Sequence, residues 1–132
     1  MLNFSFAELC NSETAEKLRL NNVPLTIEVQ DNLLLLMTEV LQPLRSKLGK
    51  PIIITSGYRC SYLNTLVGGK DNSQHLKGQA ADIKVTGMTA AALFKYIKES
   101  NIKYDQLINE YNKWVHISYN KNRNRNQSFV IC

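Results

Sequence analysis

The most regular hydrophobic pattern in the chain is a helical stripe between residues 26 and 44. Its apolar positions recur every three or four residues, which is the spacing of one face of an α-helix. These positions are Val29, Leu33, Leu36, Met37, Val40 and Leu44. Leu34, Leu35 and Leu41 widen the stripe, so we expect burial over more than half of the helix circumference. Pro43 is expected to kink or end the helix, because proline lacks an amide hydrogen and its ring clashes with the preceding turn.

Shorter patterns after this helix predict a sheet. Residues 52–55 form a β-branched run typical of a buried strand, and residues 80–85 also read as a strand. A helix capped by Thr89 is expected to follow, because apolar residues again recur at helical spacing after it. Residues 129–131 are expected to add a final edge strand.

The segment 105–119 reads as two strands joined by a short polar turn, which is a β-hairpin pattern. We expect Glu110 to pair with Trp114 across the turn. Two steps further along the hairpin, Ile108 then pairs with His116, and paired residues share one face of the sheet. Since side chains alternate along a strand, Glu110 is expected to lie diagonally opposite His116 on that face.

The length of 132 residues suits one domain with a sizeable core and is short for two. We interpret residues 1–24, which hold two short helical patterns, as an N-terminal brace and residues 25–132 as the core of the domain. The hydrophobic fraction of 44% and the charged fraction of 20% are ordinary for a soluble globular protein. The longest apolar run, residues 33–37, is far shorter than the roughly 20 residues that a membrane span needs. We expect a monomer without a membrane span.

The first residues show no basic segment followed by an apolar one, which is the pattern of a secretory signal. We therefore expect synthesis in the cytoplasm without a signal peptide. The three cysteines are widely spaced, odd in number and form no C-x-x-C pair. This argues against a disulfide scaffold and against a thiolate zinc site.

The net charge of +5 suits a polyanionic partner, either nucleic acid or an anionic cell wall. Much of this charge lies in the segment 120–127, which contains Lys121, Arg123 and Arg125. The segment is either a binding arm or a solvated loop between two strands. We favour the loop, because no aromatic side chains for stacking on bases are interleaved with the cations. We therefore expect no nucleic-acid partner.

The chain contains only two histidines, His75 and His116, and their surroundings suggest a metal site. Asp82 follows His75 at a spacing that does not place both on one helical face, unlike the H-E-x-x-H zinc motif. Gly78 between them allows a turn before the expected strand. Two imidazoles and one carboxylate form the ligand set of a catalytic zinc ion that keeps one coordination position open. The alternative is that each histidine has a structural role, and spacing alone leaves both interpretations open.

Zinc held by two neutral imidazoles and one carboxylate keeps a net positive charge, which allows it to act as a Lewis acid. Peptide hydrolysis also needs a carboxylate that takes a proton from water and passes it to the leaving amine. Glu110 is the candidate for this role, because the hairpin register puts it beside His116. Arg59 follows an expected strand and is the candidate for binding a substrate carboxylate or a developing oxyanion. The alternative for Arg59 is a surface ion pair.

The pattern S-x-H-x-x-G-x-A-x-D over residues 73–82, followed by W-V-H over residues 114–116, resembles the D-Ala-D-Ala carboxypeptidase family of zinc peptidases. That family belongs to a group shared with lysostaphin-type peptidases and the hedgehog signalling domain. The S-G-Y-R turn at residues 56–59 is also similar to the arginine-bearing segment of the family. By this resemblance His75, Asp82 and His116 are the zinc ligands, and Arg59 binds the substrate. The complete set of candidate site residues is the metal ligands His75, Asp82 and His116, the catalytic residues Glu110 and Arg59, and the substrate-binding residues Arg59, Ser73 and Ser56.

The resemblance also implies a compact α+β fold in one domain, with a small, mainly antiparallel sheet that carries the Zn2+ site and packs against helices. The implied activity is hydrolysis of peptide bonds in the stem peptides of bacterial peptidoglycan. The enzyme is then either a D-Ala-D-Ala carboxypeptidase or an endopeptidase that cuts near L-Ala-D-Glu. Short members without a signal resemble phage endolysins or phage structural enzymes, which reach the cell wall after release or with the help of other proteins.

One position departs from the family pattern. Many relatives carry the catalytic glutamate three residues before the last histidine, as E-x-x-H, and here that position is Lys113. A protonated lysine does not act as a base, so either Glu110 fills the role or the domain is inactive and only binds cell-wall peptides. We favour Glu110, because a longer gap between the glutamate and W-V-H resembles a subgroup of the family. A basic nucleic-acid-binding domain is the third hypothesis.

Overall fold

The computed structural model of the chain describes residues 2–132. Its helices are α1 (Phe6–Cys10), α2 (Glu13–Leu18), α3 (Ile27–Leu36), the π-helical turn η1 (Met37–Leu41), α4 (Gln42–Leu48), α5 (Ser61–Leu66), the 3-10 turn η2 (Gln74–Lys77) and α6 (Ala90–Lys98). Its strands are β1 (Ile53–Ser56), β2 (Ala80–Lys84), β3 (Gln106–Glu110), β4 (Trp114–Ser118) and β5 (Gln127–Ile131). No helix in this part of the chain is long and apolar enough to cross a membrane.

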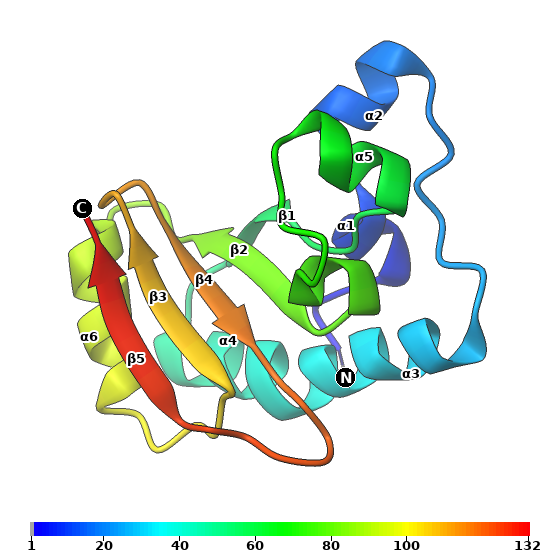
Figure 1. The fold of residues 1–132 in the computed structure, drawn as a ribbon. Coiled ribbons are helices and arrows are strands. Elements are labelled where there is room, and N and C mark those ends of the chain that lie inside the picture. The colour runs from blue at the N-terminus through cyan, green and yellow to red at the C-terminus, as the bar shows by residue number, and fades with distance from the viewer. Residues whose placement is uncertain (1) are drawn as a thin grey trace.

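Within residues 2–132, five strands form one sheet with the order β1-β2-β4-β3-β5 (Figure 1). Neighbouring strands run antiparallel except β3 and β5, which are parallel. The expected strand at residues 129–131 is present as the longer edge strand β5. Helices pack against this mainly antiparallel sheet, so the predicted α+β fold is confirmed.

The long hydrophobic stripe forms a helix that continues through α3, η1 and α4, from Ile27 to Leu48. Its fully buried side chains are Leu33, Leu36, Met37, Val40, Leu41 and Leu44. The helix does not end at Pro43, which corrects that part of the prediction. Instead, the π-helical turn comes just before the proline, and the amide of Gln42 donates to the carbonyl of Met37. Such a widened turn accommodates both the missing amide hydrogen and the ring of a proline.

Two apolar residues are more exposed than their patterns predict. Ile53 in β1 is 47% exposed, because β1 lies at the edge of the sheet and pairs only with β2. The expectation of a buried strand at residues 52–55 is therefore wrong, although Ile52 just before β1 is buried. Leu34 is also exposed, since it lies on the outer side of the long helix, and the buried stripe is narrower than expected.

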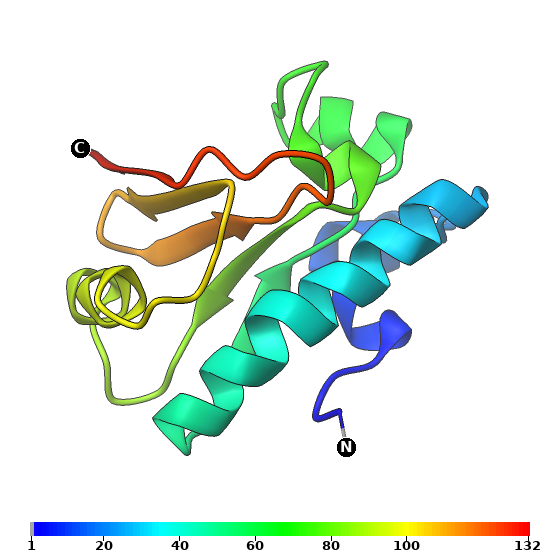
Figure 2. The ribbon, with the colours of Figure 1, turned by 90° about the horizontal axis from the view of Figure 1, so that it is seen from below.

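The two faces of the sheet have different surroundings. Figure 2 shows α6 and the long helix on one side of the sheet. Ile83, Val115 and Ile117 of β2 and β4 belong to the same buried core cluster as residues of these helices. Because side chains alternate along a strand, Asp82 and His116 point to the opposite face. The polar candidates therefore lie on the face that the long helix leaves free.

The N-terminal helices α1 and α2 begin at hydroxyl caps supplied by Ser5 and Ser12. Helix α1 packs beside β1 and α3. The segment also reaches the turn that follows β1, where the amide of Tyr58 donates to the carbonyl of Leu9 over 2.7 Å. The N-terminal residues therefore contact the turn that carries Arg59.

Candidate metal centre

The three predicted metal ligands come together from three separate elements. His75 lies on η2, Asp82 on β2 and His116 on β4. Asp82 and His116 are direct partners in the register of β2 and β4, so the sheet itself places them side by side. The ligand atoms of all three lie within 4.8 Å of one another. Such a cluster of two imidazoles and a carboxylate has the donor atoms of a catalytic zinc site.

The turn η2 brings His75 over the sheet, and its ends explain why it forms here. The hydroxyl of Ser73 accepts from the amide of His75, and Gly78 ends the turn with a φ of 73°. A side chain on Gly78 would collide with the carbonyl oxygen of Val29, at 2.7 Å. Asn32 on the long helix donates to the carbonyl of Lys77. The expected glycine turn is therefore a 3-10 turn docked onto the long helix.

A hydrogen bond from one ring nitrogen fixes the orientation of the His75 imidazole. Its Nδ1 atom lies 2.7 Å from the carbonyl oxygen of Gly57, which only accepts hydrogen bonds, so Nδ1 carries the proton. The Nε2 atom lies 3.4 Å from the Oδ1 atom of Asp82, and the His75 side chain is 3% exposed. In a neutral imidazole, the lone pair of Nε2 would then face a carboxylate oxygen. Two facing acceptors need a cation between them, and this arrangement fits a bound metal ion.

His116 completes the cluster through its Nδ1 atom. This atom lies 3.1 Å from Oδ1 of Asp82 and 3.6 Å from Oε1 of Glu110. The predicted hairpin register is confirmed, since Glu110 pairs with Trp114 and Ile108 pairs with His116. Glu110 therefore lies diagonally beside His116 on the face that carries the cluster.

The two carboxylates of the site have opposite pKa shifts. Burial by itself raises the pKa of Asp82, but the neighbouring imidazoles of His116 and His75 outweigh burial and hold its pKa well below the ordinary value. Burial and then the negative charge of Asp82 raise the pKa of Glu110. The arrangement therefore separates a carboxylate suited to ligation from one with a stronger affinity for protons.

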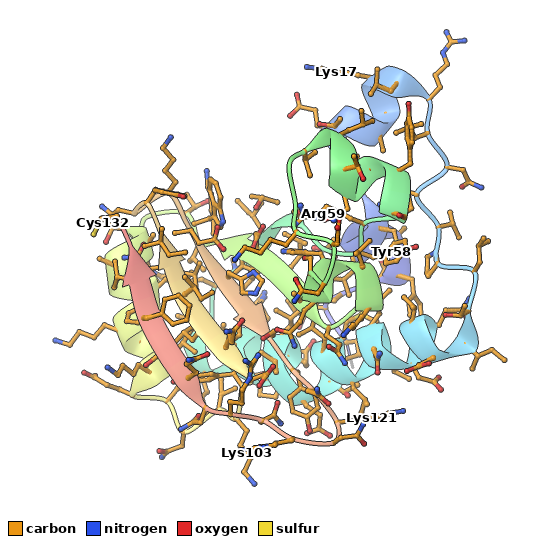
Figure 3. All side chains as sticks on the ribbon, in the orientation of Figure 1. Lys17, Tyr58, Arg59, Lys103, Lys121 and Cys132 are labelled. Atoms are coloured by element: carbon orange, nitrogen blue, oxygen red, sulfur yellow. The ribbon has the colours of Figure 1, made fainter. Side chains whose placement is uncertain are left out.

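The cluster lies in a cleft of about 710 Å³, referred to below simply as the cleft. Residues that line it include Arg59, Ser73, His75, Asp82, Glu110, His116, Arg125, Phe129 and Ile131. Figure 3 shows Arg59 between α5 and the strands of the sheet. Its Nε atom is buried and has no hydrogen-bond partner among residues 2–132. Burial lowers the pKa of Arg59, while Asp82 and Glu110 act in the opposite direction.

Two other positions discussed from the sequence lie outside the cleft lining. Ser56 pairs with Asp82 across β1 and β2 and is not among the residues of the described chain that line the cleft. Lys113 is exposed at the hairpin turn and lines a different cavity, of about 340 Å³, beside Trp114. Lys113 therefore does not occupy the position next to His116 that Glu110 holds.

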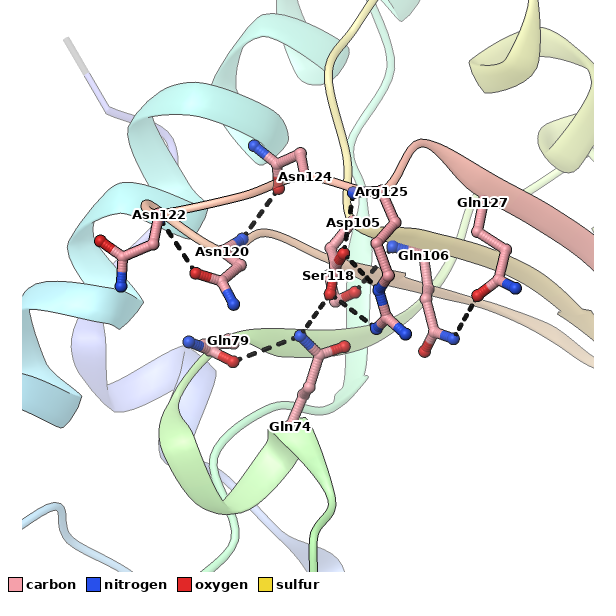
Figure 4. A network of polar contacts seen from close by, with 10 residues as sticks. All are labelled: Gln74, Gln79, Asp105, Gln106, Ser118, Asn120, Asn122, Asn124, Arg125 and Gln127. Carbon is pink, nitrogen blue, oxygen red and sulfur yellow. Dashed lines mark hydrogen bonds and ion pairs between the residues drawn. The ribbon is translucent and has the colours of Figure 1, made fainter.

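One polar network near the cleft was not expected from the sequence (Figure 4). The carboxylate of Asp105, which is 2% exposed, accepts from Nε and Nη2 of Arg125, both at 2.8 Å. It also accepts from the side-chain amide of Gln74, the neighbour of His75. Lys121, Arg123 and Arg125 are all exposed, but Arg125 is anchored by its ion pair with Asp105. No local pattern could have indicated this pair, because its members are far apart in the sequence.

Comparison with known proteins adds two findings. The family model for peptidase M15 matches residues 3–118, a range that contains the three clustered ligands, Arg59 and Glu110 but not β5. The zinc D-Ala-D-Ala carboxypeptidase of Streptomyces albus G is 36% identical over 85 residues. That match covers 62% of this chain and 31% of the relative, so the chain spans less than a third of the relative's length.

Proposed function

This chain belongs to the peptidase M15 family, and we propose that it is a zinc-dependent peptidase that hydrolyses peptide bonds in the stem peptides of bacterial peptidoglycan. The observation that carries the proposal is the cluster of His75, Asp82 and His116, in which the Nε2 atom of His75 faces a carboxylate oxygen while Nδ1 is held by the carbonyl of Gly57. The name of the Streptomyces albus G relative, a zinc D-Ala-D-Ala carboxypeptidase, supports both the metal and the class of substrate.

Three residues would hold the metal. His75 would bind it through Nε2, since Nδ1 donates to the carbonyl of Gly57, and His116 would bind it through Nδ1. Asp82 would supply a carboxylate oxygen between the two rings. When bound, zinc acts as a Lewis acid that polarises the scissile carbonyl and activates water at neutral pH. The carbonyl of Gly57 fixes the orientation of His75, as partners of ligating histidines commonly do.

Glu110 is proposed to move the proton. Its carboxylate lies beside Nδ1 of His116 at 3.6 Å, on the same face of the sheet as the ligands. It is partly buried, and its raised pKa makes it a better proton acceptor than an ordinary glutamate. Glu110 would accept a proton from the attacking water and deliver it to the nitrogen of the leaving amine.

Arg59 is proposed to bind an anionic group of the substrate. Its guanidinium lines the cleft with the metal ligands, and its buried Nε–H has no partner among the described residues. A desolvated guanidinium binds a carboxylate or a developing oxyanion strongly. Ser73 also lines the cleft and remains a candidate substrate contact. Ser56 pairs with Asp82 in the sheet but does not line the cleft, so it would contact substrate only at the edge of the site.

For the bond that is cut, we propose the terminal D-Ala-D-Ala bond first, because the relative's name gives that activity. An endopeptidase that cuts near L-Ala-D-Glu is the second candidate within the same proposal. We further propose a monomer of the phage endolysin type, which reaches the cell wall after release from the cell or by phage-assisted delivery. An inactive domain that only binds cell-wall peptides is the alternative suggested by Lys113.

The test is incubation of the purified chain with muropeptides from digested peptidoglycan, with and without a chelator, followed by mass spectrometry. Loss of one terminal alanine supports the carboxypeptidase, and cleavage after L-Ala supports the endopeptidase. Cleavage that persists after complete metal removal would contradict the zinc mechanism. Binding of one zinc ion without any cleavage would support the inactive binding domain instead.

A further inference from the structure

Asn22 is a buried polar residue in the irregular segment between α2 and α3. It is 6% exposed, and its carboxamide makes three hydrogen bonds to the backbone. The Nδ2 group donates to the carbonyl oxygens of Cys10 and Tyr58, both at 2.8 Å. The Oδ1 atom accepts from the amide of Cys60 at 2.7 Å. The side chain therefore joins the N-terminal segment to the chain that follows β1.

Two of these bonds bracket Arg59. Tyr58 and Cys60 are its immediate neighbours, so the carboxamide of Asn22 holds a peptide group on each side of it. The amide of Arg59 itself donates to the carbonyl of His75 over 3.1 Å. The backbone at Arg59 is thus fixed by Asn22 and by a candidate metal ligand.

Within residues 2–132, the side chain of Arg59 is held by neither a hydrogen bond nor an ion pair. Its Nε atom lacks a partner among residues 2–132, and no carboxylate in that range forms an ion pair with it within 4.0 Å. A methyl group added at Gly69 would lie 3.0 Å from Nη1, so the guanidinium passes close to that backbone. Without polar partners, the direction of the guanidinium depends on the backbone from which it starts and on the packing around it.

We infer that Asn22 is a positioning residue that directs Arg59 into the cleft and thereby links the N-terminal segment to the substrate site. The inference rests on the proposed role of Arg59 in binding substrate. Loss of the carboxamide would free the peptide groups on both sides of Arg59 and leave three backbone groups unpaired. Small misplacements of a binding group lower catalytic efficiency strongly, by up to about 100-fold.

A double-mutant cycle on the zinc-loaded protein tests this inference. Asn22→Ala is expected to lower kcat/KM by about 10- to 100-fold, mainly through a higher KM, with unchanged zinc content. In an Arg59→Ala background, the same substitution is expected to change kcat/KM by less than about twofold, because residues that act as a unit are not additive. An equal loss in both backgrounds would show that Asn22 does not act through Arg59.

Ser12→Ala is the matched control within the N-terminal segment. It removes the cap of α2 and costs about 1 kcal/mol of stability, but it leaves the bonds of Asn22 intact. We expect kcat/KM of this variant to stay within about twofold of the wild type at a temperature where both are folded. If it lost as much activity as Asn22→Ala, general loosening of the segment would explain both results and overturn the inference.

An NMR measurement separates this inference from the proposed function. The buried Nε–H group of Arg59 is expected to give a distinct, slowly exchanging resonance in the wild type and in Ser12→Ala. In Asn22→Ala, or in Asn22→Ser if the alanine variant does not fold, this resonance should shift or broaden. An unchanged resonance would overturn the inference whatever the activity. Conversely, if the wild type cleaves no peptide but the Asn22 variant still shows the expected shift of the Arg59 resonance, only the proposed function is contradicted.

Discussion

The Nδ1 atom of His75 lies 2.7 Å from the carbonyl oxygen of Gly57. This contact sets the proton on Nδ1 and leaves Nε2 for the cluster with Asp82. It also ties a candidate metal ligand to the turn that presents Arg59, since Gly57 and Arg59 belong to the same short segment. The two proposed functions of the site, metal binding and substrate binding, therefore share one turn after β1.

Zinc binding is expected to depend on both histidines. The purified protein should hold one zinc ion per chain, measured by mass spectrometry of the metal, and His75→Ala should lose it together with all activity. Zinc at about 100 times its dissociation constant should stabilise the native state by about 2.7 kcal/mol, seen as a higher melting temperature than with chelator. Equal melting temperatures with and without zinc would argue against the site.

Glu110→Gln is expected to lower kcat by about 100- to 10,000-fold, because the amide does not accept the proton from water. The variant should keep its zinc, since Glu110 is not among the three clustered ligands. Lys113→Ala is the control and should leave kcat within about twofold, because Lys113 lines another cavity. An active Glu110→Gln variant would exclude Glu110 as the base.

Gly57→Ala is expected to damage both stability and metal binding. A methyl group at this position would lie 2.1 Å from the carbonyl oxygen of Leu9, so the backbone has to move. We expect the free energy of unfolding, measured in urea, to fall by about 1–3 kcal/mol. Zinc affinity should become about 10- to 100-fold weaker, because the carbonyl of residue 57 no longer orients His75.

Gly49→Ala is the control for Gly57→Ala. At Gly49 an added methyl group meets nothing within 4 Å, although its φ of 65° makes alanine strained. This variant should lose about 1 kcal/mol of stability without any change in zinc affinity. Unchanged zinc affinity in Gly57→Ala as well would show that its carbonyl does not support His75.

The pair of Asp105 and Arg125 predicts a pH-dependent stability. The hydrogen bond from Arg125 lowers the pKa of Asp105 from 3.8 to about 2, against the effect of burial. A lowered pKa stabilises the native state above the pKa of the unfolded chain, and this stabilisation is lost as the pH falls toward the native value. We therefore expect Arg125→Met to cost about 1–2 kcal/mol at pH 7, since the arginine is half-exposed.

The cost of Arg125→Met should shrink between about pH 4 and pH 2, where protonation of Asp105 removes the advantage of the wild type. Urea unfolding with chelator present throughout measures this difference in the free energy of unfolding without a contribution from metal release. Arg123→Met removes the same charge from the same loop without an ion pair, and should cost less than about 0.5 kcal/mol. A cost for Arg125→Met that stays constant down to pH 2 would contradict the assignment to Asp105.

Several features of the molecule were determined by the sequence alone. Alternation along the hairpin placed Glu110 and His116 on one face, and the structure has that register. Helical periodicity likewise located the long helix. Both predictions concern residues that are close in the sequence. The regular geometry of a helix or a strand fixes the relative directions of their side chains. The two histidine candidates followed from residue type, because the chain has only two histidines, and the resemblance of the S-x-H-x-x-G-x-A-x-D pattern completed the set with Asp82.

Only the tertiary structure decided which distant groups meet around the site. Asn22 bonds to residues 36 and 38 positions away, and Asp105 bonds to Arg125 across 20 positions. The edge position of β1 and its exposed Ile53 also depend on strand order, which no local pattern encodes. Such contacts form where segments that are distant in the sequence pack together, so the partners depend on the overall fold of the chain. Residue types and motif spacing therefore indicated the candidate metal ligands, whereas the packing of distant segments determined what orients them.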